Sequence, residues 1–412
     1  MKALSGIRII DLTMGWAGPL ACRHLADMGA DVIKVESCER FDWWRSWEAT
    51  PEWIRDDGAE KSNAFNTMNR NKRDVTLDLE HPDGRELLLQ LIASAHAVVE
   101  NYSGGVLPKL GLGYEVLREV KPDIILLSMP AFGSTGPWAG FRAYGSTVEQ
   151  SSGLPHLQGD QTMPPVMQQV AYGDAIGGLN GSAALLTALR HQAKTGEGQF
   201  VDLSQAEAMF PLGIQGILHT SVTGNNPERQ GNFHPNAVPH NVYPCLGDDQ
   251  WLLIQIFEES QWLSLCHIVG DELVGFGSKA ERLEQVVALN EVIANWTRPQ
   301  EAEVLMLKLQ QAGIPAAMCL SSKRLVENPH LKERGFWQWL DRAVVGHQPN
   351  PSAPYLVHGK RVSIDAPAPT LGQHNSEVLK DLLGLNDGRL AYLTSEGVIG
   401  DKPRMPGTGS VK

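Results

Sequence analysis

The first 130 residues alternate short apolar runs with segments of helical spacing. Residues 6–12 and 30–36 are predicted strands, and the helix predicted between them, residues 20–28, ends at Gly29. Such a βαβ unit joins two parallel strands by a right-handed crossover. The alternation continues with predicted strands 74–79, 97–101 and 123–128 and predicted helices 82–95 and 114–120. This pattern predicts an α/β fold with a doubly wound, Rossmann-like sheet.

The composition changes near residue 220. Residues 223–244 are rich in Gly, Pro, Asn and His and have no periodicity, which is typical of a linker or an active-site loop. We therefore predict two domains: a large Rossmann-like domain of residues 1–219 and 332–412, and a smaller α+β domain with its linkers, residues 220–331. The tail from Gly400 is expected to be disordered.

Charge and cysteine content exclude several classes of protein. Lys and Arg number 35 against 47 Asp and Glu, so the net charge is −12, and a nucleic-acid partner is not expected. The five cysteines form no Cys-x-x-Cys pair, which argues against a disulfide framework or a zinc ribbon. Neither a secretory leader nor a long apolar span is visible, so we expect a cytoplasmic enzyme with no membrane partner.

The first turn could bind a nucleotide. Gly15 and Gly18 lie where a Rossmann fold has its phosphate-binding turn, and Glu36 ends the second strand. The full G-x-G-x-x-G fingerprint is absent, so a tight turn with a strand-end carboxylate is the preferred interpretation and a nicotinamide cofactor is disfavoured.

Three further clusters have two interpretations each. Residues 70–73, Arg-Asn-Lys-Arg, are either a solvated turn or a site for the phosphates of a nucleotide-like ligand. The Trp-rich stretch 41–53 either fills a core or covers a pocket. His234 and His240 are six residues apart in a loop, with Cys245 nearby, and we expect no metal site there.

Asp174 stands just before a predicted helix, residues 175–191. It is either the N-cap of that helix or a nucleophile that the helix dipole keeps ionised. Gly177 and Gly178 weaken a helix by roughly 1 kcal/mol each. Their presence indicates that something approaches the helix backbone closely.

Ten short motifs, in order along some 370 residues, resemble the class III CoA-transferases, the formyl-CoA and carnitine CoA-transferase (CaiB/BaiF) family. They are residues 4–12, 17–19, 25–36, 69–73 with 77–79, 99–102, 143–144, 173–174, 195–199, 313–315 and 371–374. The resemblance implies an interlocked, ring-like homodimer that binds an acyl-CoA and a small carboxylic acid. It implies no cofactor beyond CoA itself and no metal.

The resemblance also assigns roles to residues. The family's nucleophile falls on Asp174, and its Asp-x-x-Arg motif falls on Asp42 and Arg45. The residues it implies for CoA binding are Trp16, Ala17, Arg45, Arg73, Leu77, Asp78, Leu79, Glu80, Asn101, Tyr102, Ser103, Lys109, Arg142 and Tyr144. The implied reaction passes through a mixed anhydride and an aspartyl-CoA thioester.

The chain departs from the oxalate-using members of this family. They carry Gln where this chain has Trp16 and Arg where it has Ser37, and their Gly-rich loop is replaced here by residues 231–241. A larger or more apolar acid than oxalate is therefore expected. Two alternatives remain: an α-methylacyl-CoA racemase, which would need a His near Tyr144, and a non-catalytic CoA-binding protein.

Overall fold

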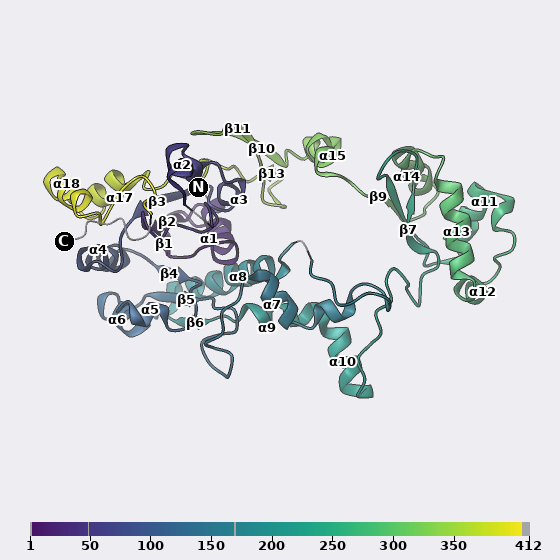
Figure 1. Cartoon of the computed structure of the whole chain (residues 1–412), viewed down its shortest axis with the longest axis horizontal. Coiled ribbons are helices and arrows are strands. Elements are labelled where there is room, and N and C mark those ends of the chain that lie inside the picture. The colour runs from purple at the N-terminus through teal and green to yellow at the C-terminus, as the bar shows by residue number, and fades with distance from the viewer. Residues whose placement is uncertain (1, 48, 169, 406–412) are drawn as a thin grey trace. The chain divides into compact units, whose positions relative to one another are not determined.

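The computed structural model describes residues 2–47, 49–168 and 170–405 (Figure 1). The chain divides into two compact units. The first comprises Met1–Leu154, Met167–Gln215 and His330–Lys412, and the second comprises Pro155–Val166 and Gly216–Pro329. The first unit contains the sheet predicted from the sequence. No helix in the described part of the chain has the length and apolar content needed to span a bilayer.

A six-stranded parallel sheet organises the first unit. Its strands, in spatial order, are β3 (Lys72–Thr76), β2 (Asp31–Glu36), β1 (Arg8–Asp11), β4 (Ala97–Glu100), β5 (Ile125–Ser128) and β6 (Phe200–Asp202). Every neighbouring pair is parallel. The order 3-2-1-4-5-6 is that of the dinucleotide-binding Rossmann fold, so the predicted α/β class and doubly wound sheet are confirmed.

Apolar side chains on both faces of the strands make the sheet doubly covered. On β1, Ile9 packs into the core beneath α1 (Ala17–Asp27) and α8 (Tyr172–Thr195), whereas Ile10 packs into the opposite core. That second core is closed by α4 (Pro82–Ala93), α6 (Tyr114–Val120), α17 (Asn375–Asp381) and α18 (Asp387–Ser395). Successive strand residues point to opposite faces, so a parallel strand buried on both sides carries apolar residues on both of its faces.

The glycines of α8 allow α1 to pack closely against it. A Cβ on Gly178 would lie 2.7 Å from the carbonyl oxygen of Ala17, and one on Gly181 would lie 2.7 Å from the Met129 side chain. A Cβ on Gly177 would lie 3.0 Å from Cγ of Gln205. The close approach predicted for Gly177 and Gly178 is therefore made by other parts of the protein.

The second unit has its own core. Its antiparallel sheet has the order β7 (His240–Pro244), β8 (Trp251–Gln255), β9 (Ala316–Met318). The helices α11 (Glu259–Val269), α13 (Val286–Thr297) and α14 (Ala302–Gln311) pack their apolar faces on this sheet.

The remaining α-helices and β-strands are seven residues long or less, except α10, which has ten. They are α2 (Pro51–Arg55), α3 (Asn63–Met68), α5 (Val106–Lys109), α7 (Gly145–Ser151), α9 (Gln205–Met209), α10 (Ile214–Thr223), α12 (Lys279–Glu284), α15 (Ser322–Glu327), α16 (Pro329–Glu333), β10 (Trp337–Arg342), β11 (Gly346–Pro351), β12 (Leu356–Val357) and β13 (Lys360–Arg361).

Two predictions from the sequence are wrong: the bounds of the third strand, and disorder of the tail from Gly400. The third strand runs from Lys72 to Thr76 instead of 74–79, which places the basic cluster partly inside the sheet. The tail is ordered up to residue 405: Gly400 N–H donates to Thr76 Oγ1 at 2.8 Å, and Arg404 N–H donates to the Cys38 carbonyl at 2.7 Å. Residues 406–412 lie outside the described part.

A buried network of ion pairs lies at β1, β2 and β3. Lys72 Nζ is 2.8 Å from an Asp11 oxygen, and Lys34 Nζ is 3.0 Å from an Asp42 oxygen; all four side chains are fully buried. Buried charges are stable only when paired and hydrogen-bonded. The network therefore holds the strands and the loop after β2 in one arrangement.

Candidate active site

Asp174 occupies the third position of α8, inside its first turn. The helix begins at Tyr172, and the N-cap residue is Ala171, whose side chain makes no capping hydrogen bond. The prediction that Asp174 caps this helix from outside is therefore wrong. The helix begins three residues earlier than expected, because Tyr172 and Gly173 adopt helical conformations that their types do not favour.

Backbone donors hold the Asp174 carboxylate. It accepts hydrogen bonds from the backbone N–H groups of Ala17, at the start of α1, and Gly145, at the start of α7. Burial nevertheless raises the pKa of Asp174 to about 6, with these two hydrogen bonds opposing the rise. At pH 7 the ionised form still prevails by about ten to one, as the nucleophile interpretation requires.

Gly145 is the residue that lets α7 approach Asp174. A Cβ at this position would lie 1.8 Å from Asp174 Oδ2 and 2.7 Å from the Ala171 Cβ. Any other residue would push the carboxylate away from the backbone N–H group that it accepts from. The glycine therefore belongs to the site for a steric reason.

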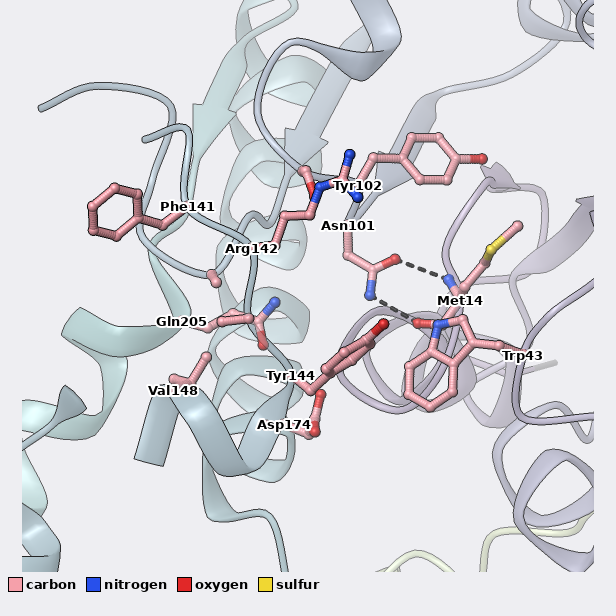
Figure 2. A pocket seen from close by; sticks show the side chains of 14 residues that line it. Met14, Trp43, Asn101, Tyr102, Phe141, Arg142, Tyr144, Val148, Asp174 and Gln205 are labelled. Carbon is pink, nitrogen blue, oxygen red and sulfur yellow. Dashed lines mark hydrogen bonds between the residues drawn. The ribbon is translucent and has the colours of Figure 1, made fainter. Parts of the chain in front are cut away.

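Asp174 faces a cavity of about 240 Å³ in the first unit (Figure 2). Its polar wall contains Asn101, Ser103, Arg142, Tyr144 and Gln205, and its apolar wall contains Met14, Trp43, Phe141 and Val148; Tyr102, Ala131, Ala143 and Gly145 complete it. Arg142 is the one cation among the described residues that line it. A cavity with one half-buried carboxylate, one cation and several hydrogen-bonding side chains suits a small acid or an acyl group.

An aromatic cluster forms one side of this cavity. Trp43, Trp47 and Tyr144 contact one another with ring centroids 4.4 to 5.6 Å apart. Trp43 lies beneath Gly15, where a Cβ would be 2.1 Å from its ring. Trp47 and Tyr144 are 67% and 58% exposed, so the structure favours a pocket cover over a buried core for this stretch.

Asn101 ties two strand ends together at the wall of the cavity. Its side chain accepts from Met14 N–H and donates to the Met14 carbonyl, both at 2.8 Å (Figure 2). The carboxyl ends of β1 and β4 are neighbours in the sheet. A reciprocal amide pair of this kind fixes the turn after β1 relative to β4.

A second cavity, of about 270 Å³, adjoins the first and shares Met14 and Tyr102 with it. Its lining is mainly apolar and includes four residues singled out in the sequence, Leu77, Asp78, Leu79 and Glu80, with Val35, Glu36, Ser37, Arg40, Phe41, Val106 and Leu110. The two cavities together bring ten of the fifteen predicted residues to one end of the sheet.

Five predicted residues line neither cavity: Trp16, Ala17, Arg45, Arg73 and Lys109. Ala17 contributes through its backbone, and Lys109 is exposed on α5 but lines neither cavity. Trp16 lines neither cavity, and its ring lies 5.5 Å from that of Trp44. The Trp16 indole N–H is buried with no hydrogen-bond partner among the described residues.

Direct contact of Arg45 with CoA is a wrong prediction. Its guanidinium is fully buried and pairs with Glu36 at 2.9 Å and Glu60 at 3.1 Å. These bonds stabilise the loop after β2. The Arg45 guanidinium also lies over the Phe65 ring, 3.6 Å from its centroid, and this contact stabilises the loop further. The role of Arg45 is therefore structural, and Glu36 is not free to bind ribose.

The basic cluster 70–73 is also not an open phosphate site. Arg70 is buried and pairs with Asp27 at 2.7 Å, and Lys72 pairs with Asp11. Arg73 is partly exposed but is held by Asp31 at 2.6 Å and Glu377 at 3.1 Å, away from both cavities. Neither interpretation of the cluster is right, because these charges serve ion pairs within the fold.

Several lining residues were not singled out from the sequence. Gln205 and Phe141 reach the cavity from α9 and from the loop after β5, and neither has a local motif. Gly145 belongs to the segment 142–145 that the resemblance assigns to CoA contact, but its steric role beside Asp174 had no signal in the sequence. The ring centroids of His234 and His240 in the 231–241 loop are 5.2 Å apart. The described residues contain no group of three or more His, Cys, Asp or Glu side chains that could hold a metal ion.

Comparison with known proteins identifies the family. Residues 4–375 match the family model described as CoA-transferase family III. The chain is 31% identical to a succinate–glutarate CoA-transferase of Agrobacterium fabrum, over 92% of this chain and 95% of that one. It is also 31% identical to a succinyl-CoA–D-citramalate CoA-transferase of Chloroflexus aurantiacus, over 97% and 98% of the two chains.

A solved structure agrees in fold. This chain is similar to the crystal structure of a CaiB/BaiF family protein from Brucella suis, with 30% sequence identity and a TM-score of 0.83. The match covers 92% of this chain and 99% of that chain. The sequence match, the parallel sheet and the half-buried aspartate at the start of α8 all agree with the resemblance noted above. This chain is a member of the family III CoA-transferases.

Proposed function

We propose that this enzyme moves CoA from a succinyl-CoA-like donor to a dicarboxylic acid, with Asp174 as the nucleophile. The observation that carries the proposal is the Asp174 carboxylate, which is half-buried, held by two backbone N–H groups and open to a cavity. The raised pKa keeps this carboxylate reactive, because a desolvated anion gains by forming a neutral acyl derivative.

The reaction conserves the thioester. An Asp174 oxygen attacks the thioester carbonyl carbon, the C–S bond breaks, and CoA leaves as a thiolate from a mixed anhydride. The thiolate then attacks the side-chain carbonyl of Asp174, which releases the donor acid and leaves an aspartyl-CoA thioester. The acceptor carboxylate repeats the two steps in reverse.

The backbone donors have a role in the step in which the thiolate attacks the side-chain carbonyl of Asp174. When the side-chain carbon of Asp174 becomes tetrahedral, negative charge develops at the group to which the Ala17 and Gly145 N–H groups already donate. Donors aimed at a developing oxyanion lower the barrier, because they need no reorganisation.

The two adjoining cavities accommodate the two ends of CoA in this proposal. The thiol lies in the cavity beside Asp174, and the nucleotide lies in the more apolar cavity lined by Leu77, Leu79 and Arg40. Met14 and Tyr102, which line both, lie where the pantetheine would pass. This replaces the expectation that residues 70–73 bind the nucleotide.

A dicarboxylic acceptor is supported by the two enzymes named above, which act on succinate, glutarate and D-citramalate. Arg142 places a positive charge in the wall of the cavity, which suits a dianion. The test is to incubate the enzyme with succinyl-CoA and, separately, glutarate, citramalate, oxalate and butyrate. New CoA thioesters of the longer dicarboxylates are expected, whereas transfer to oxalate alone would contradict the proposal.

The racemase alternative is disfavoured by Tyr144, which stands near Asp174 where a basic His would be needed. Incubation of a chiral 2-methylacyl-CoA in deuterated water is expected to give no solvent exchange. Deuterium uptake at the rate of turnover would reverse this ranking, and binding without either reaction would favour a CoA-binding protein.

The pH dependence of the first step follows from Asp174. Its pKa is about 6, so the nucleophilic anion is lost as the pH falls through that value. Below pH 6, single-turnover loading from acyl-CoA should slow by about tenfold per pH unit. A loading rate that stays constant down to pH 5 would contradict ionised Asp174 as the nucleophile.

A homodimer is part of the proposal. Leu179, Leu212 and Ile214 are 46 to 50% exposed, and an apolar surface of this kind fits contact with a second copy of the chain. In an interlocked dimer the subunits cannot separate without unfolding. Light scattering should give a dimer at low micromolar protomer concentration, and a folded monomer there would contradict the proposal.

A further inference from the structure

Glu149 is a fully buried carboxylate to which the reaction above gives no role. It lies on α7, four residues after Gly145, and is 0% exposed. Its two oxygens accept from backbone N–H groups just before and at the start of α8: Oε1 from Gln168 at 3.1 Å and Oε2 from Tyr172 at 3.3 Å. No ion pair among the described residues involves Glu149, and the hydrogen bonds given above come from backbone N–H groups.

The start of α8 needs such an acceptor. The first N–H groups of a helix have no partner within the helix, and Ser, Thr, Asp or Asn usually satisfies them from the N-cap. Here the N-cap is Ala171, which has no side-chain acceptor. Tyr172 is the first residue of α8, so Glu149 satisfies one of these free N–H groups from another helix.

The same short helix contacts the first turn of α8 in two other ways. A Cβ on Gly173 would lie 2.9 Å from the Gly145 carbonyl oxygen and 2.9 Å from the Val148 Cβ, so α7 and α8 are in close contact here. The Gly145 N–H donates to Asp174. Movement of α8 relative to α7 would therefore displace the Asp174 carboxylate from its donor.

We infer that Glu149 is a positioning residue, which caps α8 in place of Asp174 so that the Asp174 carboxylate can face the cavity. An aspartate in the first turn of an uncapped helix is itself a good acceptor for the free N–H groups. With Glu149 bonded to that end of the chain, Asp174 is free for chemistry. This inference rests on the proposed function, since it concerns how Asp174 is presented to the acyl group.

Glu149→Gln and Glu149→Ala separate positioning from stability. The glutamine keeps one acceptor oxygen and loses the other, and the alanine loses both. Single-turnover loading from succinyl-CoA should fall about tenfold in Glu149→Gln and about a hundredfold in Glu149→Ala, because small displacements of a reacting group cost this much. KM for succinyl-CoA should change less than about twofold, since neither cavity is lined by Glu149.

Two further readouts distinguish positioning from a general loss of structure. The amide of Tyr172 should lose protection from hydrogen exchange in Glu149→Ala, while amides of β1 and β4 keep theirs. The acid limb of the loading rate should move below pH 6, because a loosened α8 exposes Asp174 to water and relieves the desolvation that raises its pKa. The exposed neighbour Gln150, changed to Ala, is the matched control and should behave as wild type.

The outcomes are separable. Wild-type enzyme that is never loaded by any acyl-CoA would overturn the proposed function itself. Wild-type enzyme that loads normally, with both Glu149 variants loading within twofold of it and with an unmoved acid limb, would overturn the positioning role alone. A raised KM with unchanged loading rate at saturation would also overturn it, because that pattern belongs to a binding residue.

Discussion

Changing Asp174 to Asn is expected to reduce CoA transfer by at least about a thousandfold. The amide occupies the same space but cannot form the mixed anhydride or the aspartyl-CoA thioester. In the described part of the chain, no other carboxylate lines the cavity that contains Asp174, so no other group is placed to replace it. The measurement is steady-state transfer from succinyl-CoA to the best acceptor of the panel.

The same substitution should stabilise the protein at neutral pH. The pKa of Asp174 is about 6 in the folded chain against 3.8 for a solvated aspartate, so its ionised form is disfavoured by folding. This destabilises the wild type by about 1–3 kcal/mol above pH 6, and the difference disappears below pH 4, where both forms are neutral. Asp174→Asn should therefore melt higher than wild type at pH 7.5 and at the same temperature at pH 3.5–4.

A matched control is Asp83→Asn, in the first turn of α4, where Asp83 pairs with Arg389 at 3.0 Å on the surface. It should keep wild-type activity and should not gain stability. Asp174→Asn with more than a few per cent of activity would contradict the nucleophile assignment, even if the thermal shift were as expected.

Lys72→Met should have the second large effect, on stability. Lys72 Nζ donates to Asp11 at 2.8 Å, to Asn69 at 2.8 Å and to the Pro19 carbonyl at 3.0 Å, all in the interior. Removing one partner of a buried ion pair leaves the other charge uncompensated, which costs roughly 3–5 kcal/mol. Thermal melts should show a large fall in Tm, or the variant should not accumulate as folded protein.

Two comparisons make this prediction specific. Lys61→Met removes an exposed lysine of the same segment and should leave Tm nearly unchanged. Arg73→Met loses the partly exposed ion pairs with Asp31 and Glu377. Any weakening of binding should be equal for CoA and dephospho-CoA. A fully stable Lys72→Met, or an Arg73 variant that loses CoA but keeps dephospho-CoA, would restore the basic cluster as a phosphate site.

The fold was predictable because hydrophobic periodicity is local. The observed strands β1, β2, β4 and β5 lie within the predicted strands 6–12, 30–36, 97–101 and 123–128, respectively. The alternation of these strands with helices implied the parallel sheet. The start of β3 was missed because Lys72, a charged residue, is buried there by pairing with Asp11. Such pairing joins residues far apart in the sequence and has no local signal.

The site was predictable where a motif marks it and not where the fold assembles it. Asp174, Tyr144 and Asn101 were found through their motifs, whereas Gln205 and Phe141 were not. Arg45 shows the opposite error: its motif is present, but Glu36 and Glu60 bind its guanidinium. The start of α8 was misplaced because its acceptor, Glu149, lies 23 residues before Tyr172 and on another helix.

The most direct test of the account is to trap the acyl-enzyme. Wild-type protein is loaded with succinyl-CoA without an acceptor, treated with hydroxylamine, digested and analysed by mass spectrometry. The account predicts a hydroxamate on the peptide that contains Asp174, and none in Asp174→Asn. A hydroxamate on another residue, or none in wild-type protein that is transferring CoA, would contradict a reaction through Asp174.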